Sequence, residues 1–216
     1  MPYRRQTHER RGLRSLVSRR TSARDINILL DHTQTLRKTS DTEHEDDLSD
    51  RLVKRLRLDP RIRNSPFSPI REFRVYDGPI DEAGHSGRID ICFMCMGGDQ
   101  TYFAVEAKNL HVTYTSGWKS RVTEYVTSDQ GMMCFVTSKY AAAQQVGAML
   151  GYVFNGDIDQ ARISIARAIE ANRLALKVED ESGLVRSNIV ERTERVDESH
   201  HRFNRRPFTI YHLLVP

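Results

Sequence analysis

The chain has 216 residues, of which 38% are hydrophobic and 29% are charged, and its formal net charge is +4. This length accommodates one well-buried domain with a tail, and the composition is typical of a globular protein rather than a membrane or collagen-like chain. The longest apolar runs, such as residues 26–30, are far shorter than the roughly 20 residues that span a bilayer. The arginine-rich start lacks the apolar core of a signal peptide, so we expect a cytoplasmic protein with no membrane partner.

Residues 1–24 are predicted to be a basic, flexible arm, because they contain eight arginines against a single acidic residue, Glu9. Such a segment suits a phosphate backbone, since binding releases condensed counterions. The arginines of the arm that we take as candidate nucleic-acid contacts are Arg4, Arg5, Arg10 and Arg11. A solubilising tail is the alternative, because a charge run alone does not identify a nucleic-acid partner. Residues 25–216 are predicted to form a single domain.

Hydrophobic periodicity predicts the elements of this domain. In chain order they are a helix over 22–36, a helix from 41 or 42 to 58, a loop over 61–70, strands over 71–76, 88–96 and 101–109, a helix over 118–126, a strand over 132–137, helices over 141–154 and 157–176, and a strand over 208–215. Residues 178–199 are charged and ambiguous. The order helix, strand, strand, strand, helix, strand, followed by extra C-terminal helices, predicts an α/β fold with a mixed sheet flanked by helices.

The strand over 88–96 is apolar on both faces, which is typical of a strand in the middle of a sheet. Cys92 and Cys95 lie on this strand as a CxxC pair, and such a pair raises the possibility of a zinc or redox site. Residues three apart on a strand point to opposite faces, and no second pair completes a tetrahedral zinc site. We therefore interpret both cysteines as buried structural thiols.

Acidic and basic side chains meet on the predicted hairpin over 88–109. If residues 97–99 form a three-residue loop, Met96 pairs with Gln100, and counting back along both strands places Asp90 opposite Glu106. Lys108 follows Glu106 by two residues and therefore emerges on the same face. Facing carboxylates repel each other unless a cation lies between them, and Mg²⁺ prefers oxygen ligands. The hairpin thus predicts a Mg²⁺ site at Asp90 and Glu106, beside a lysine that can stabilise charge on a phosphate.

The segments Gly87-Arg88-Ile89-Asp90 and Val105-Glu106-Ala107-Lys108 resemble the core of the PD-(D/E)xK nucleases, which have the restriction-endonuclease-like fold. The resemblance covers about residues 42–137, and Ile89 stands where the family pattern has proline. It implies cleavage of DNA, or less often RNA, with Mg²⁺ or Mn²⁺, in the manner of nucleases of prokaryotic restriction and anti-phage defence. The small size of the chain and the lack of a recognisable targeting domain suggest that specificity comes from a homodimer or from partner proteins.

The resemblance further implies a carboxylate from the helix that precedes the strands. Glu45 is the candidate, because it precedes Leu48, Leu52 and Leu56 at helical spacing and so lies on the buried stripe. An N-terminal acid favoured by the helix dipole is the alternative explanation for Glu45, and Glu43 is the second candidate.

Additional candidate nucleic-acid contacts follow the second strand of the hairpin: Lys119, Arg121, Tyr125, Gln130, Lys139 and Tyr140. Packing and solvated charge are the alternative roles for these residues. The histidines His200, His201 and His212 lack partners at metal-ligand spacing and are not predicted to bind a metal. Two rivals to the enzyme stay open: a catalytically silent nucleic-acid-binding or assembly subunit with the same fold, and a structural domain whose acids and lysine form a cross-strand salt bridge.

Overall fold

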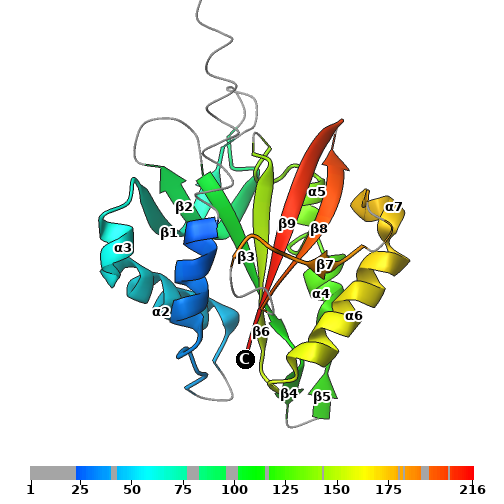
Figure 1. Cartoon of the computed structure of the whole chain (residues 1–216), viewed down its shortest axis with the longest axis horizontal. Coiled ribbons are helices and arrows are strands. Elements are labelled where there is room, and N and C mark those ends of the chain that lie inside the picture. The colour runs from blue at the N-terminus through cyan, green and yellow to red at the C-terminus, as the bar shows by residue number, and fades with distance from the viewer. Residues whose placement is uncertain are drawn as a thin grey trace, which may run out of the picture.

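The structure is a computed structural model that describes residues 23–39, 43–76, 83–95, 102–114, 117–142, 144–179, 181, 183–190, 195–203 and 205–216. These residues form a seven-stranded sheet with helices on both faces and a separate two-stranded ribbon (Figure 1). The predicted α/β class, with a mixed sheet flanked by helices, is therefore confirmed. No helix within the described ranges is long and apolar enough to cross a membrane. Most of the predicted basic arm, residues 1–22, lies outside these ranges.

The large sheet contains, in chain order, β1 (Phe67–Val75), β2 (Gly87–Cys95), β3 (Tyr102–Leu110), β6 (Val146–Val153), β7 (Val185–Arg186), β8 (Val196–Phe203) and β9 (Arg206–Val215). Their order across the sheet is β1-β2-β3-β6-β9-β8-β7. The strands β3, β6 and β9 run parallel, and the other neighbouring pairs are antiparallel. The ribbon consists of β4 (Val112–Tyr114) and β5 (Gly117–Lys119).

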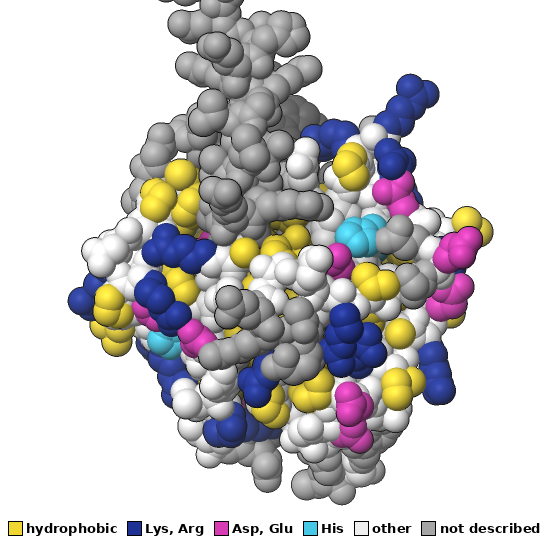
Figure 2. All heavy atoms as spheres, viewed as in Figure 1, with side chains coloured by type: hydrophobic (Ala, Val, Ile, Leu, Met, Phe, Trp, Pro, Cys, Tyr) yellow, Lys and Arg dark blue, Asp and Glu magenta, His cyan; other side chains and the backbone are white. Residues whose placement is uncertain are grey.

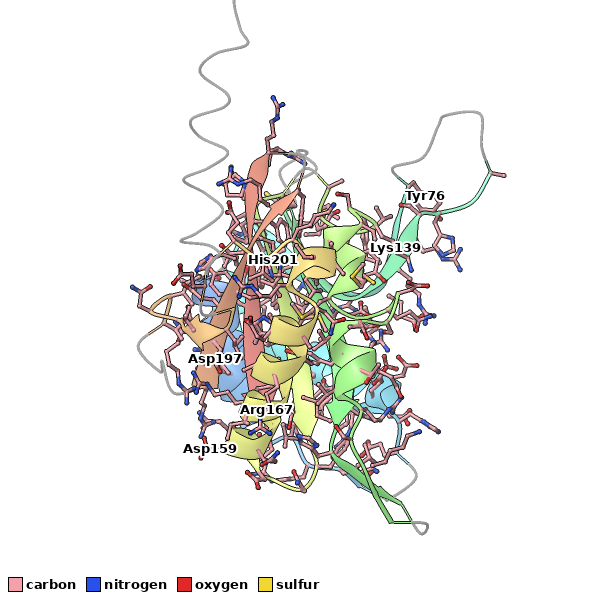
Figure 3. All side chains as sticks on the ribbon, turned by 90° about the vertical axis from the view of Figure 1, so that its right-hand side faces the viewer. Tyr76, Lys139, Asp159, Arg167, Asp197 and His201 are labelled. Carbon is pink, nitrogen blue, oxygen red and sulfur yellow. The ribbon has the colours of Figure 1, made fainter. Side chains whose placement is uncertain are left out.

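The helices cover the two faces of the sheet with two apolar clusters. On one face lie the helical residues 23–33, α2 (Glu45–Leu58) and α3 (Pro60–Arg63). On the other face lie α4 (Val122–Val126), α5 (Met133–Val136), α6 (Ile158–Ala171) and α7 (Arg173–Leu176). Figure 3 shows residues 23–33 on one side of the sheet and α4 and α5 on the other. The two clusters enclose the central strands, which explains why those strands are apolar on both faces.

The strand β2 confirms this two-sided burial residue by residue. Ile91 and Phe93 belong to the cluster under α2, whereas Cys92 belongs to the cluster under α4 and α5. Cys95 packs against the first cluster, so the two thiols of the CxxC pair lie on opposite faces, and both are free. The interpretation of Cys92 as a buried structural thiol agrees with this placement, whereas Cys95 is only partly buried.

The predicted helix over 141–154 is wrong, because residues Val146–Val153 form β6 in the centre of the sheet. Alanine, methionine and leucine in this segment favour a helix by composition, but every residue of β6 is buried, and burial on both sides overrides propensity. Its two glycines fit the strand. A Cβ atom on Gly147 would lie 2.5 Å from the Phe135 ring, and one on Gly151 would lie 2.6 Å from Leu110.

Three further predictions are corrected. Residues 132–137 form the short helix α5 instead of a strand, because a short apolar run does not distinguish a buried helix from a buried strand. The predicted helix over 118–126 begins only at Val122, and Gly117, with φ of 113°, starts the strand β5 before it. The predicted loop over 61–70 contains α3 and the start of β1, where Pro69 is tolerated because β1 is an edge strand.

The C-terminal part gives a mixed result. The helical prediction over 157–176 is confirmed by α6 and α7, and the final strand is confirmed by β9. The ambiguous segment 178–199 supplies β7 and the first half of β8, which extend the sheet beyond β9. From α2 to β6 the predicted order of helix, three strands, helix and strand is therefore met in part. The structure adds α3, β4 and β5, and the last strand is β6 in place of residues 132–137.

Candidate metal and catalytic site

The predicted register of the hairpin is confirmed. The strands β2 and β3 pair from Ile91 with Val105 to Met94 with Tyr102, in the predicted register. Asp90 and Glu106 lie one step beyond the paired residues, and the Asp90 side chain accepts a hydrogen bond from the Ala107 amide. The loop residues 97–99 lie outside the described ranges. Because successive side chains alternate between faces, Lys108 emerges on the same face as Glu106.

Asp90 is held in place by hydrogen bonds from a neighbouring strand. Its Oδ2 atom accepts a hydrogen bond of 2.8 Å from the backbone amide of Ala107, and Asp90 as a whole is only 9% exposed. On the opposite side, Arg71 of β1 donates to the carbonyl oxygen of Asp90 at 3.1 Å and lies 3.7 Å from its Oδ1 atom. These contacts fix the direction in which the carboxylate points.

Glu106 and Lys108 form a buried ion pair on β3. The Lys108 ammonium donates to Glu106 Oε1 at 2.9 Å and to the carbonyl oxygen of Ala107 at 2.8 Å. It also lies 3.9 Å from Asp90 Oδ2. Glu106 is 2% exposed, and its second oxygen, Oε2, is buried and has no hydrogen-bond partner within the described part of the chain. An unpaired buried carboxylate oxygen is costly, which marks this position as one suited to a ligand.

Glu45 joins this group from α2, on the face of the sheet that residues 23–33 also cover. Its Oε1 atom lies 3.4 Å from the Lys108 ammonium, and its Oε2 atom accepts a hydrogen bond of 3.0 Å from the backbone amide of Asn109. The predicted buried stripe of α2 is confirmed, since its leucines are buried while Asp46 and Asp47 are exposed. Glu43, the second candidate, instead pairs with Arg51 at 2.7 Å.

The electrostatics of the site show more negative charge than its lysine neutralises. Burial raises the pKa of Glu106 to about 8, and the neighbouring Asp90 carboxylate adds to the effect. Burial also raises the pKa of Asp90, although the Lys108 ammonium acts against it. Burial alone would lower the pKa of Lys108, but the carboxylates of Glu106 and Asp90 outweigh it and raise that pKa. Lys108 therefore stays charged, while one of the carboxyl groups tends to retain a proton.

Arg71 is a site residue that the sequence analysis did not single out. It lies on β1, and its guanidinium bridges Asp90 to Asp46 and Asp50 of α2, with a distance of 2.9 Å from Nε to Asp50 Oδ1. The alternating charges of β1 did not indicate that Arg71 would belong to the site. Asp46, Asp50 and Asp90 come close to Arg71 only when α2 packs against the sheet. Arg71 thus couples the start of α2 to the hairpin of β2 and β3.

Tyr140 and Tyr125 are core residues, which corrects the prediction that they contact nucleic acid. The Tyr140 hydroxyl donates to the carbonyl oxygen of Arg88, and a Cβ atom on Gly87 would lie 2.3 Å from the Tyr140 ring. Tyr140 therefore supports the start of β2, next to Asp90. Tyr125 is fully buried in α4, and its hydroxyl lies 3.0 Å from His212 Nδ1.

The other candidate contacts have varied surroundings. Lys119 and Gln130 are exposed, whereas Arg121 pairs with Glu124 of α4. The Lys139 ammonium lies over the Tyr140 ring, 5.8 Å from its centroid. The candidate arginines of the arm, Arg4, Arg5, Arg10 and Arg11, lie outside the described residues. On the face seen in Figure 2, basic side chains lie interspersed with acidic and hydrophobic ones, so the described part of this face offers no single basic surface.

The C-terminal histidines form a buried hydrogen-bond chain instead of a metal site. His212 Nε2 lies 2.8 Å from the Ser199 hydroxyl, which lies 2.7 Å from His201 Nε2. His201, placed on β8 in Figure 3, continues the chain to the carbonyl oxygen of Leu176 at 2.8 Å. Burial lowers the pKa of His212 to about 3 and that of His201 to about 4, so both are neutral at pH 7.

Among the residues that the structure describes, no group of three or more histidine, cysteine, aspartate and glutamate side chains has the arrangement of a metal site. The three carboxylates of Asp90, Glu106 and Glu45 surround the Lys108 ammonium instead. Comparison of the chain with family models, curated proteins and solved structures gave no significant match. The function is therefore inferred from the geometry of the site and from the chemistry of the residues that form it.

Proposed function

We propose that the protein is a metal-dependent nuclease that hydrolyses phosphodiester bonds, in DNA more than in RNA. The observation that carries the proposal is the convergence of Asp90, Glu106 and Glu45 on one lysine from three separate elements. The partly exposed network of Arg61 with Asp31 and Asp59 also joins one cation to two carboxylates, but Asp90, Glu106 and Lys108 are buried. Burying an excess of carboxylates is unfavourable unless a cation compensates for it.

The arrangement of the elements supports assignment to the restriction-endonuclease-like fold as part of the same proposal. The helix α2 precedes the antiparallel strands β1, β2 and β3, and β6 returns parallel to β3 after α4 and α5. The acids and the lysine lie on the two adjacent central strands and at the start of α2. This is the placement that the resemblance of the two sequence motifs implies for such a nuclease.

The residues of the site fit a hard divalent cation such as Mg²⁺, for which Mn²⁺ can substitute. The donors are oxygen atoms of Asp90, Glu106 and Glu45, which are the ligands that Mg²⁺ prefers. The unpaired Glu106 Oε2 atom supplies an acceptor that no group of the described residues satisfies. When bound, Mg²⁺ supplies Lewis acidity that neutralises phosphate charge and makes water a better nucleophile at neutral pH.

The residues of the chain have distinct roles in this proposal. The Ala107 amide and Arg71 hold the Asp90 carboxylate in a fixed direction, which avoids reorganisation during the reaction. Lys108 stabilises negative charge that develops on the phosphate oxygens. Lys119 and the basic arm remain predicted backbone contacts, since exposed cations favour phosphates.

The biological context is proposed from the resemblance of the motifs alone. It comprises restriction or phage defence in the cytoplasm, with a homodimer or partner proteins supplying specificity. Another subunit or partner would supply the contacts that read a sequence, because phosphate contacts position a protein on nucleic acid but carry no sequence information.

Cleavage assays test the proposal directly. Supercoiled plasmid, single- and double-stranded DNA oligonucleotides and RNA are incubated with Mg²⁺, Mn²⁺ or EDTA. We expect metal-dependent cleavage that falls by about a hundredfold or more in Asp90→Asn and Lys108→Ala. Lys54→Ala, which removes an exposed lysine of α2, is the matched control and should cut at the wild-type rate.

The opposite results are equally clear. Cleavage that persists in EDTA, or an Asp90→Asn variant that cuts as fast as the wild type, would refute the proposal. Salt-sensitive DNA binding without cleavage, under every metal condition, would favour the catalytically silent binding subunit.

A further inference from the structure

The Lys108 ammonium occupies the centre of the oxygen atoms of the site. Its nitrogen lies 2.8 Å from the Ala107 carbonyl oxygen, 2.9 Å from Glu106 Oε1 and 3.4 Å from Glu45 Oε1. The Asp90 Oδ2 atom completes the group at 3.9 Å, and the lysine side chain is only 8% exposed. The four oxygens belong to β2, β3 and α2, and the lysine side chain folds back toward the backbone carbonyl that precedes it.

This position is one that a divalent cation would also take. Carboxylate and backbone carbonyl oxygens are ligands for hard cations, and Mg²⁺ draws them to about 2.0–2.1 Å. An ammonium nitrogen holds the same oxygens at about 2.7–2.9 Å through hydrogen bonds. The contact with the Ala107 carbonyl oxygen carries the argument. This oxygen is uncharged, so ion pairing with the carboxylates does not by itself explain why the Lys108 ammonium lies beside it. The nitrogen and an ion would compete for the same oxygens.

We infer that Lys108 is an internal counter-ion that a divalent cation must displace before the site can act. The inference rests on the proposed metal site. In the metal-free protein the lysine partly neutralises the three carboxylates. When a cation enters, the ammonium leaves Glu106 Oε1 and Ala107 O and becomes available to a phosphate group. Lys108 therefore lowers metal affinity and delays formation of the complete site until the metal is bound.

Calorimetric titration with Mg²⁺ and Mn²⁺ tests the competition without using activity. Lys108→Met is compared with Arg71→Met, a matched control in which the lost cation lies 3.7 Å from Asp90 Oδ1, against 3.9 Å from Asp90 Oδ2 for Lys108. Loss of a nearby charge raises metal affinity in both variants through Coulomb's law. We expect Lys108→Met to bind about tenfold or more tightly than Arg71→Met, because only it vacates the cation position. Equal affinities in the two variants would overturn the inference.

A second measurement needs no substitution. Lysine acetylation of the wild-type protein is followed by peptide mass spectrometry with and without Mg²⁺, with exposed Lys54 as the internal control. We expect Lys108 to react several-fold faster with Mg²⁺ while Lys54 is unchanged. If calorimetry shows binding but Lys108 labelling does not rise, the inference fails and the metal site stands. If neither the wild type nor Lys108→Met binds a divalent cation, the proposed metal-dependent function fails as well.

Discussion

Replacing Glu106 by glutamine should make the metal-free protein more stable at alkaline pH. In the folded protein, burial and the neighbouring Asp90 raise the pKa of Glu106 from 4.5 to about 8. Below pH 4.5 the carboxyl group is protonated in both folded and unfolded chains. Between pH 4.5 and about 8 the unfolded chain releases this proton while the folded protein retains it, so stability falls as the pH rises. Glutamine keeps the shape and cannot ionise.

The size of the effect follows from the same shift. Each pH unit between the two pKa values is worth about 1.4 kcal/mol of unfolding free energy. The interval from 4.5 to about 8 therefore sets an upper limit of about 5 kcal/mol, reached above pH 8. Relaxation of the site and entry of water reduce this value, so we expect a gain of about 2–4 kcal/mol for Glu106→Gln at pH 9.

Urea unfolding of both proteins in EDTA at pH 5, 7 and 9 measures this gain. At pH 5 the two free energies of unfolding should be similar, because Glu106 is still protonated in the folded protein. At pH 9 the variant should unfold at the higher urea concentration, with an unchanged slope. A stability difference between the two proteins that is the same at all three pH values would refute the reasoning, since it would show that Glu106 ionises as readily in the folded protein as in the unfolded chain.

Other predictions concern the metal and the buried histidine chain. Mg²⁺ at about 100 times its dissociation constant should stabilise the wild type by about 3 kcal/mol; calorimetric melting should show no such shift for Asp90→Asn. Ser199→Ala should cost about 1–3 kcal/mol in urea unfolding, because it leaves groups of His201 and His212 unpaired. The lowered pKa values of these histidines, about 4 and about 3, mean that stability should fall as the pH drops from 6.5 toward 4, since unfolding then takes up protons. Acid titration in a Glu106→Gln and Asp25→Asn background removes two carboxyl groups whose raised pKa values, about 8 and about 7, act in the opposite direction. A flat profile there would contradict the trend.

The site could be predicted from the sequence where local geometry determines it. The alternation of side chains on a strand and the length of the hairpin loop are enough to place Asp90 opposite Glu106 and Lys108 beside it. The helical repeat likewise placed Glu45 on the buried stripe of α2. Each of these inferences uses a period of two or 3.6 residues over a short segment. The structure confirms the register of the pairs next to Asp90 and Glu106, and it brings Glu45, Glu106 and Asp90 to the Lys108 ammonium.

The remaining parts depend on contacts between distant segments. The strand β6 resembles a helix in composition, and only its position between β3 and β9 makes it a strand. Arg71 contributes to the site because α2 and β2 lie on either side of it in space. Tyr125 and Tyr140 have polar groups that suit a surface, yet their hydroxyls find partners in the core. Spacing in the sequence carries no information about such neighbours.

The charge balance of the site links its stability to its proposed function. Arg71, the other cation near Asp90, is shared with Asp46 and Asp50. Among the described residues, Lys108 is the cation that contacts all three carboxyl groups of Asp90, Glu106 and Glu45. The apolar clusters on the two faces of the sheet must therefore offset the cost of burying this excess charge. A variant such as Glu106→Gln removes the cost and the cation ligand together, so it should gain stability and lose metal binding. The same substitution that strengthens the fold would thus disable the site, which is the relation expected of a functional group and not of a structural salt bridge.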